Sequence, residues 1–511
     1  MDTRLAYRRL RHVLVLLLGL TALAMALNAW TYSYANGVPL VQADAWVFLD
    51  TYVRKYLEGN FGWKDIFLQA YSTDTNLPLH KLVLLFHINH FHMDFKVEGL
   101  IGVVAAMALV MVLVVAAAGV RLSRWRLASF ALLAWLAMVT LSLNSSNVYS
   151  WPLATMWFLN LLIVALYLVY MAKSGVGPGR ALAVTLLLGL LLDEVAMITV
   201  LAAVAALLIQ RDPRPLRDRL LQGGGAVAGL LIVRGAYWWF YAAHGIGDQP
   251  TTGTAGFLHN LVAVVTSEGV RLALVPLGDS LIHQSVLDFW FPARAGALAT
   301  VIGVVLLCAH LWFWWRVVRS REELPAEAVR TRRVAIALML FFYGTVAGLA
   351  LQRIPEFGIG YLHQPRYVIF YQLNLAALGL LAYAEFCRWI PRNDERRLAG
   401  APFLIVLVAL GVLQWHLSLR SWDETKYRSA WFEGAGRIMG QLAARPDAQL
   451  QCTPELPVCD YPVAKRRELM FLLQNYQLNI FNPDFQAFHR LRPFPPPPAA
   501  ADASTASKPG E

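Results

Sequence analysis

The chain has 511 residues, of which 58% are hydrophobic and 15% charged, with a mean hydropathy of +0.49. A soluble domain is closer to one-half apolar and one-quarter charged, so the composition excludes that class and predicts an all-α polytopic membrane protein. The net charge of +11 comes from basic clusters between apolar stretches, which mark cytoplasmic loops, so we expect no nucleic-acid binding.

The transmembrane module is expected over residues 1–420. Four arginines precede the first apolar stretch, which places the N-terminus in the cytoplasm. The stretch lacks a small-x-small ending, so we interpret it as a retained helix and not a cleaved signal peptide. The expected spans lie at 12–30, 99–119, 127–143, 152–172, 220–242, 295–315, 334–352, 367–387 and 402–419.

The segment 31–98 is a polar and aromatic loop that we place on the external side, with two interfacial helices. Apolar residues recur at helical spacing over 44–58, which predicts an amphipathic helix lying on the membrane. Asp44 precedes this helix and can cap its N-terminus or act as a general base. Asp50, on the same helix, is the reserve candidate for the base.

A second helix is predicted to begin near Leu79. Lys81 lies in its first turn, where an anion is favoured and a lysine adds a point charge for phosphate. Asp74 and His80 are further candidates there, and solvated interface residues are the alternative. A histidine run follows whose spacing matches no zinc signature, so a divalent metal is possible but not indicated and no cofactor is expected. Its weak candidate ligands are His87, His90 and His92.

The stretch 181–209 is apolar, has Asp193 and Glu194 at its middle, and is flanked by arginines on both sides. Both flanks stay in the cytoplasm if the stretch forms a short hairpin with the charged pair at its external end. The hairpin brings the total to about 11 transmembrane helices. Carboxylates at membrane depth are usually functional, the alternative being an inward-facing structural pair. Arg234 in the next span needs a buried partner, for which Glu268 or Asp279 are the suggestions.

A late external loop carries Arg353, His363, Arg366 and Tyr367. Arginine binds phosphate through a planar fork of donors, so these residues are candidates for a phosphate site. An ordinary interfacial Arg/Tyr belt is the alternative.

The C-terminal segment 421–492 is predicted to lie outside the membrane, on the external side. Cys452 and Cys459 fall within it, and an oxidising compartment favours a disulfide between them. Residues 493–511 are rich in proline and alanine, so we expect them to be disordered.

The pattern resembles the GT-C superfamily of integral-membrane glycosyltransferases. The resemblance covers residues 1–420 as topology and is carried by three short stretches: Ala43-Asp44-Ala45-Trp46, Leu192-Asp193-Glu194-Val195 and Pro365-Arg366-Tyr367. It implies a GT-C-like fold that transfers a sugar from a polyprenyl-phosphate donor to an envelope acceptor at the external face of a bacterial inner membrane. Asp44 would activate the acceptor, with Asp50 or Glu194 in reserve, and Lys81 or Arg366 would hold the donor phosphate.

Two other functions use a similar architecture. A transporter or flippase of a lipid-linked precursor would show repeats and charges along a central pathway, whereas here the charges gather at one face. An O-antigen polymerase or ligase also uses lipid-linked sugars, but its large loop usually comes late in the chain. One base and one phosphate clamp favour direct displacement with inversion at the anomeric carbon.

Overall fold

The computed structural model describes residues 3–69, 77–119, 127–210, 214–244, 262–319, 326–389, 401–453 and 456–491. Throughout these ranges the regular structure is helical, and nine helices are long and apolar enough to cross a membrane. The protein is therefore a polytopic helical membrane protein. The main spanning helices are α1 (Thr3–Asn36), α6 (Phe95–Met111), α7 (Leu127–Thr140), α10 (Trp157–Met171), α13 (Leu216–His244), α17 (Ala295–Arg319), α18 (Ala326–Phe357), α20 (Leu373–Trp389) and α21 (Ala401–Asp423).

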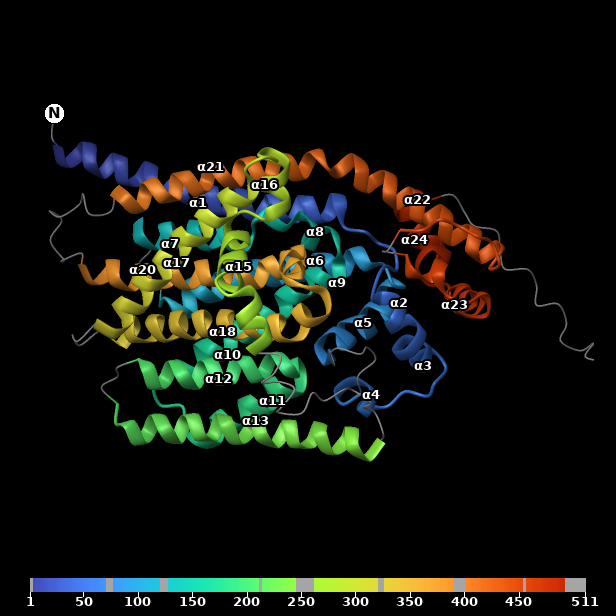
Figure 1. Cartoon of the computed structure of the whole chain (residues 1–511), viewed down its shortest axis with the longest axis horizontal. Coiled ribbons are helices and arrows are strands. Elements are labelled where there is room, and N and C mark those ends of the chain that lie inside the picture. Colours follow the sequence, from blue (N-terminus) through green and yellow to red (C-terminus); the bar gives the residue numbers. More distant parts are fainter. Residues whose placement is uncertain are drawn as a thin grey trace, which may run out of the picture.

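Short helices extend or join these spans. α6 continues into η2 (Val112–Ala117), and α7 is followed by η4 (Leu143–Ser145), α8 (Ser146–Ser150) and α9 (Pro152–Thr155). α15 (Arg271–Leu281) and α16 (Gln284–Trp290) precede α17, while η5 (Ile359–His363), η6 (Pro365–Tyr367) and α19 (Val368–Tyr371) lead into α20. Most long helices run along the same direction, with α1, α6, α7, α10, α18 and α20 around the main core (Figure 1).

The stretch 181–209 lies in two helices, α11 (Pro178–Leu192) and α12 (Glu194–Ile209), separated only by Asp193. Asp193 has φ +45° and ψ −114°, an unusual conformation that breaks the helix at this point. α11 has 15 residues and rises about 22 Å, less than the ~30 Å of hydrocarbon in a bilayer. α11 packs along α13 and α12 along α18. Close packing with α13 needs small residues, since a Cβ on Gly229 would lie 2.8 Å from the Leu182 carbonyl oxygen.

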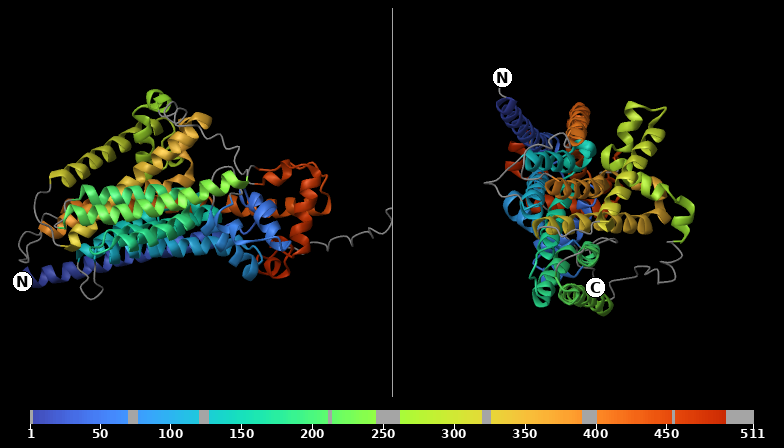
Figure 2. Two further views of the ribbon diagram at one scale, coloured as in Figure 1. Left: turned by 90° about the horizontal axis from the view of Figure 1, so that it is seen from below. Right: turned by 90° about the vertical axis from the view of Figure 1, so that its left-hand side faces the viewer.

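The first loop and the C-terminal segment form a second core at one end of the molecule, which we call the cap. The loop supplies α2 (Ala45–Phe48), η1 (Leu49–Val53), α3 (Arg54–Leu57), α4 (Trp63–Phe67) and α5 (Pro78–Phe91). The C-terminal segment supplies α22 (Thr425–Ala444), η8 (Pro457–Asp460), α23 (Val463–Asn475), η9 (Asn479–Phe481) and α24 (Pro483–Phe488). Figure 2 shows both segments gathered at the end opposite the N-terminus.

Asn479 fastens the two halves of the cap. Its side-chain amide donates to the carbonyls of Pro39 at 2.8 Å and Met93 at 2.6 Å, and its backbone N–H donates to His92. The Asp94 carboxylate also lies 2.8 Å from Nε2 of His489. Because the C-terminal segment is held on the first loop, both must lie on the same side of the membrane.

The amphipathic stretch 44–58 differs from its prediction. Trp46, Leu49 and Tyr52 are fully buried in the cap core, against residues of the C-terminal segment. The apolar face therefore packs on protein and is not available to lipid. The helical spacing was predicted correctly. The apolar face, however, packs on the C-terminal segment, about 400 residues further along the chain, and not on the membrane.

Candidate functional site

A groove of about 1280 Å3 lies where the cap meets the ends of the spanning helices. The first loop, α8, α16, the late loop around Gln364, α21 and α22 all contribute to its lining. The lining residues are Val38, Gln42, Ala43, Asn147, Ser150, Trp151, Phe289, Trp290, Gln364, His416, Leu419, Arg420, Asp423, Glu424, Lys426, Tyr427, Arg428 and Trp431. The groove thus collects residues from both ends of the sequence.

The groove has an apolar wall and a charged wall. Phe289 on α16 is 69% exposed, and Leu419 on α21 is 48% exposed, so both present apolar surface. Arg420 on α21 and Glu424, which lies between α21 and α22, bring charge to the same groove. A surface of this kind suits a ligand with a hydrocarbon part and a charged part.

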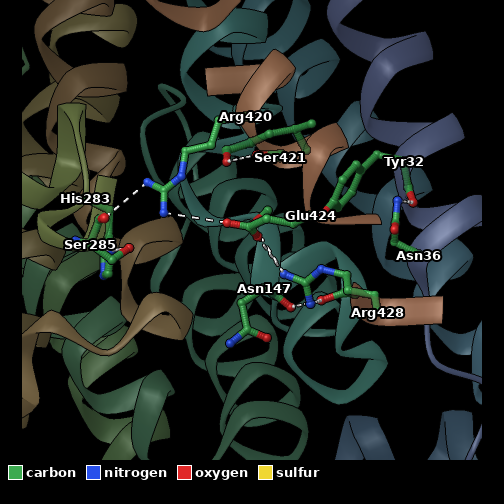
Figure 3. A network of polar contacts seen from close by, with 12 residues as sticks. Tyr32, Asn36, Asn147, His283, Ser285, Arg420, Ser421, Glu424 and Arg428 are labelled. Carbon is green, nitrogen blue, oxygen red and sulfur yellow. Dashed lines mark hydrogen bonds and ion pairs between the residues drawn. The ribbon is translucent and has the colours of Figure 1, made fainter. Parts of the chain in front are cut away.

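The charged wall is a row of side chains spaced four residues apart (Figure 3). Glu424 lies between Arg420 and Arg428, with N–O distances of 3.6 Å and 3.5 Å. Each arginine has a further partner, because Arg420 donates to the Ser285 carbonyl and Arg428 to the Ser150 hydroxyl. Helical spacing explains the row, since residues i and i+4 share one face. Three basic and two acidic side chains line the groove, which leaves an excess of one positive charge.

A smaller chamber of about 190 Å3 adjoins the groove. The two cavities share Asn147 and the Arg420, Glu424 and Arg428 row. Serine, asparagine and histidine side chains make up most of the remaining lining of the chamber.

Arg366 lies behind the groove. Its guanidinium carbon is 5.9 Å from the centre of the Trp151 ring, 5.7 Å from that of Tyr361 and 5.3 Å from that of Tyr367. It also donates a hydrogen bond of 2.5 Å to the Tyr361 hydroxyl. Trp151 itself lines the groove, so Arg366 is separated from the groove by one ring.

His363 in the same loop is oriented by Asp279, whose Oδ2 lies 2.8 Å from its Nδ1. The His363 carbonyl accepts a hydrogen bond from Nε2 of His283, a residue of the chamber. Arg353 is half-buried on α18, and Tyr367 is buried. The late loop therefore contacts both cavities, while Gln364 and Pro365 supply the lining residues.

Asp44 is exposed and directly follows Ala43, a residue that lines the groove. Its side chain does not cap α2, although its position suggested it. Asp50 accepts from Arg54 at 2.8 Å and from Lys465 on α23 at 2.5 Å, so it joins the two halves of the cap. Burial raises the pKa of Tyr461, and the carboxylates of Asp50 and Asp44 raise it further.

Lys81 lies away from the groove. Its ammonium donates to the carbonyls of Asp65 at 2.9 Å, Ile66 at 3.2 Å and Gln69 at 2.5 Å. Burial lowers the pKa of Lys81 to about 7, a shift that the carboxylates of Asp65 and Asp193 partly oppose. Lys81 therefore holds α4 and the residues after it onto α5.

Asp193 is the buried partner of Arg234, with its Oδ1 2.5 Å from Nη1. The two suggested partners were wrong, since Glu268 pairs with Arg271 and Asp279 with His363. The turn of α11 into α12 brings Asp193 to the side of α13, where it meets Arg234.

The other predicted residues are placed as follows. Glu194 is half-buried at the start of α12. Burial lowers the pKa of His80 to about 4, and its ring packs edge-on against Trp157. His90 and His92 are exposed, and His87 is buried 3.8 Å from Glu98.

No group of three His, Cys, Asp or Glu side chains in the described ranges is arranged to hold a metal. Cys452 and Cys459 are joined by a disulfide. Asp74 and the tail 493–511 lie outside the described residues.

Sequence reasoning missed the Arg420, Glu424 and Arg428 row. The signal was present, because these residues follow the last apolar stretch at four-residue spacing. Comparison of the chain with models of protein families, with curated proteins and with solved structures found no match. A function must therefore be argued from the geometry of the site.

Proposed function

We propose that the protein is a GT-C-like glycosyltransferase that moves a sugar from a polyprenyl-phosphate donor to an envelope acceptor. It acts on the external side of a bacterial inner membrane, with its N-terminus in the cytoplasm and its C-terminus in the periplasm. The observation that carries the proposal is the groove, in which an apolar wall and a charged wall line one cavity beside a polar chamber.

The donor fits the groove by its two chemical parts. Its isoprenoid chain lies along the apolar wall at Phe289 and Leu419, where burial of hydrocarbon is favourable. Its phosphodiester carries one negative charge, which matches the single excess positive charge of the lining. Arg420 and Arg428 hold the phosphate through their planar forks and stabilise the charge that develops on the leaving phosphate. Arg366 supports this wall through Trp151.

The reaction needs a base at the mouth of the groove. Asp44 is exposed next to the lining residue Ala43, and its carboxylate takes the proton of the acceptor hydroxyl as that oxygen attacks the anomeric carbon. The bond from the anomeric carbon to the phosphate oxygen breaks, and the polyprenyl phosphate leaves as a phosphate monoester. Attack and departure on opposite sides invert the anomeric configuration.

Farnesyl phosphate binding to the full chain in nanodiscs tests the proposal. Arg428→Ala should weaken binding at least about tenfold, since it removes a charge-assisted contact. Arg437→Ala is the matched control, because Arg437 is an exposed residue on the same helix that does not line the groove. Equal affinities for the two variants would remove the lipid phosphate from this groove, and with it the proposed donor site.

A further inference from the structure

The chamber beside the groove has a lining of its own. Apart from the residues that it shares with the groove, it is lined by uncharged polar side chains and a few apolar ones, together with His283. Ser146 on α8 and Ser285 on α16 lie on two of its sides, and Ser421 on α21 lies on a third. The chamber is therefore polar without a fixed charge beyond the shared row.

This lining offers both hydrogen-bond donors and hydrogen-bond acceptors. A serine hydroxyl can donate and accept, the Asn147 amide does both, and Glu424 in the shared row only accepts. Leu143 and Leu417 provide small apolar patches between them. Sugar rings need this mixture, because their hydroxyl groups donate and accept while their C–H faces are apolar. Outside the shared row the lining has no acidic, lysine or arginine side chain, so that part of the chamber offers an anion no charged partner of this kind.

The size of the chamber sets the scale of its ligand. A volume of about 190 Å3 equals the space of roughly six water molecules at ~30 Å3 each. This is the scale of one sugar ring. The shared row places any ring bound here directly beside the proposed phosphate site.

We propose that the chamber is a subsite for a single monosaccharide ring, which binds through hydrogen bonds to Ser146, Asn147 and Ser285. Its assignment to donor or acceptor rests on the proposed function, but the binding of the ring does not. The ligand is a neutral ring with several hydroxyl groups. Either the sugar of the donor or a terminal sugar of the acceptor has this chemistry.

The test uses the full chain in nanodiscs and a panel of methyl glycosides of glucose, mannose, galactose and arabinose. Saturation-transfer NMR should show binding of at least one glycoside to the wild type. Ser146→Leu fills the chamber from α8 and should weaken that binding at least about tenfold, because the ring loses its space and its hydrogen bonds. Ser285→Leu, at an exposed position on a separate element, should do the same if Ser146→Leu fails to fold. Ser429→Leu is the control, because Ser429 is exposed on α22 and lines neither cavity.

Competition then identifies the source of the ring. Displacement of the glycoside by a farnesyl-phosphoryl sugar, but not by farnesyl phosphate, assigns the chamber to the donor sugar. Binding that survives both competitors assigns it to the acceptor. A glycoside signal that is absent in the wild type, or unchanged in both chamber variants, overturns the subsite. Failure of farnesyl phosphate to bind overturns the donor groove instead, so the two failures are distinguishable.

Discussion

Replacement of Arg234 by methionine should destabilise the protein more than loss of its partner does. The Arg234→Met variant keeps an unbranched apolar stem but leaves the Asp193 carboxylate, whose side chain is only 7% exposed, without its guanidinium. Removing one partner of a buried ion pair costs about 3–5 kcal/mol, since the remaining charge is poorly solvated.

The reverse change should cost less. In Asp193→Asn the guanidinium of Arg234 is left without the carboxylate, but its side chain is 35% exposed and can be hydrated. We expect a loss of about 1–2 kcal/mol, in the range of a lost hydrogen bond to a charged group. The double variant has no buried charge at this position, so it should be more stable than Arg234→Met alone.

Thermal unfolding of the four proteins in one lipid nanodisc preparation measures this order. The melting temperature of the double variant should lie close to that of Asp193→Asn and above that of Arg234→Met. Additive losses in the double variant would refute the pairing, because independent sites add whereas coupled sites do not. Full sugar-transfer activity in the double variant would further show that Asp193 has a structural role and not a functional one.

Three further changes test other parts of the site. Asp44→Asn should lower transfer by about 10²–10⁴-fold with lipid binding intact, and a fully active variant would shift the role of base to another carboxylate. Arg366→Lys should restore little of the donor affinity lost in Arg366→Ala, because lysine lacks the planar guanidinium that lies over three rings. Equal donor affinity of the wild type and Arg366→Ala would exclude the late loop from the donor site. For Lys81, the pKa of about 7 lies below the usual lysine value of 10.5, so the unfolded state binds more protons between these values. The free energy of unfolding should therefore rise from pH 7 to about 10, and Lys81→Met should flatten the rise seen in melting temperatures.

The spanning helices could be predicted because length and apolarity alone define them. For the stretch 181–209 the arginine flanks predicted two short helices, and the structure has two, α11 and α12, broken at Asp193. The side of the membrane on which Asp193 lies stays a prediction. The cap could not be predicted, because Asn479 meets Pro39 and Met93 only in the folded chain. The apolar periodicity of 44–58 shows that a face will be buried and does not show against what.

The site residues stay predictions. Asp44 was placed at the external end of the first span, and in the structure it is exposed and follows Ala43, a residue that lines the groove. Lys81 was assigned to the donor phosphate from charge and position, but the sequence does not show the three carbonyls that surround its ammonium. The Arg420 and Arg428 pair was overlooked, because Arg420 at the end of α21 and Arg428 at the start of α22 lie beyond the last predicted span.

A cryo-electron microscopy map of the protein in nanodiscs with farnesyl phosphate tests the central claim most directly. The account predicts phosphate density within hydrogen-bond distance of the Arg420 and Arg428 guanidiniums, with the isoprenoid chain running past Phe289. Lipid-phosphate density elsewhere, for example beside Lys81, with the groove empty at saturating ligand, would contradict it.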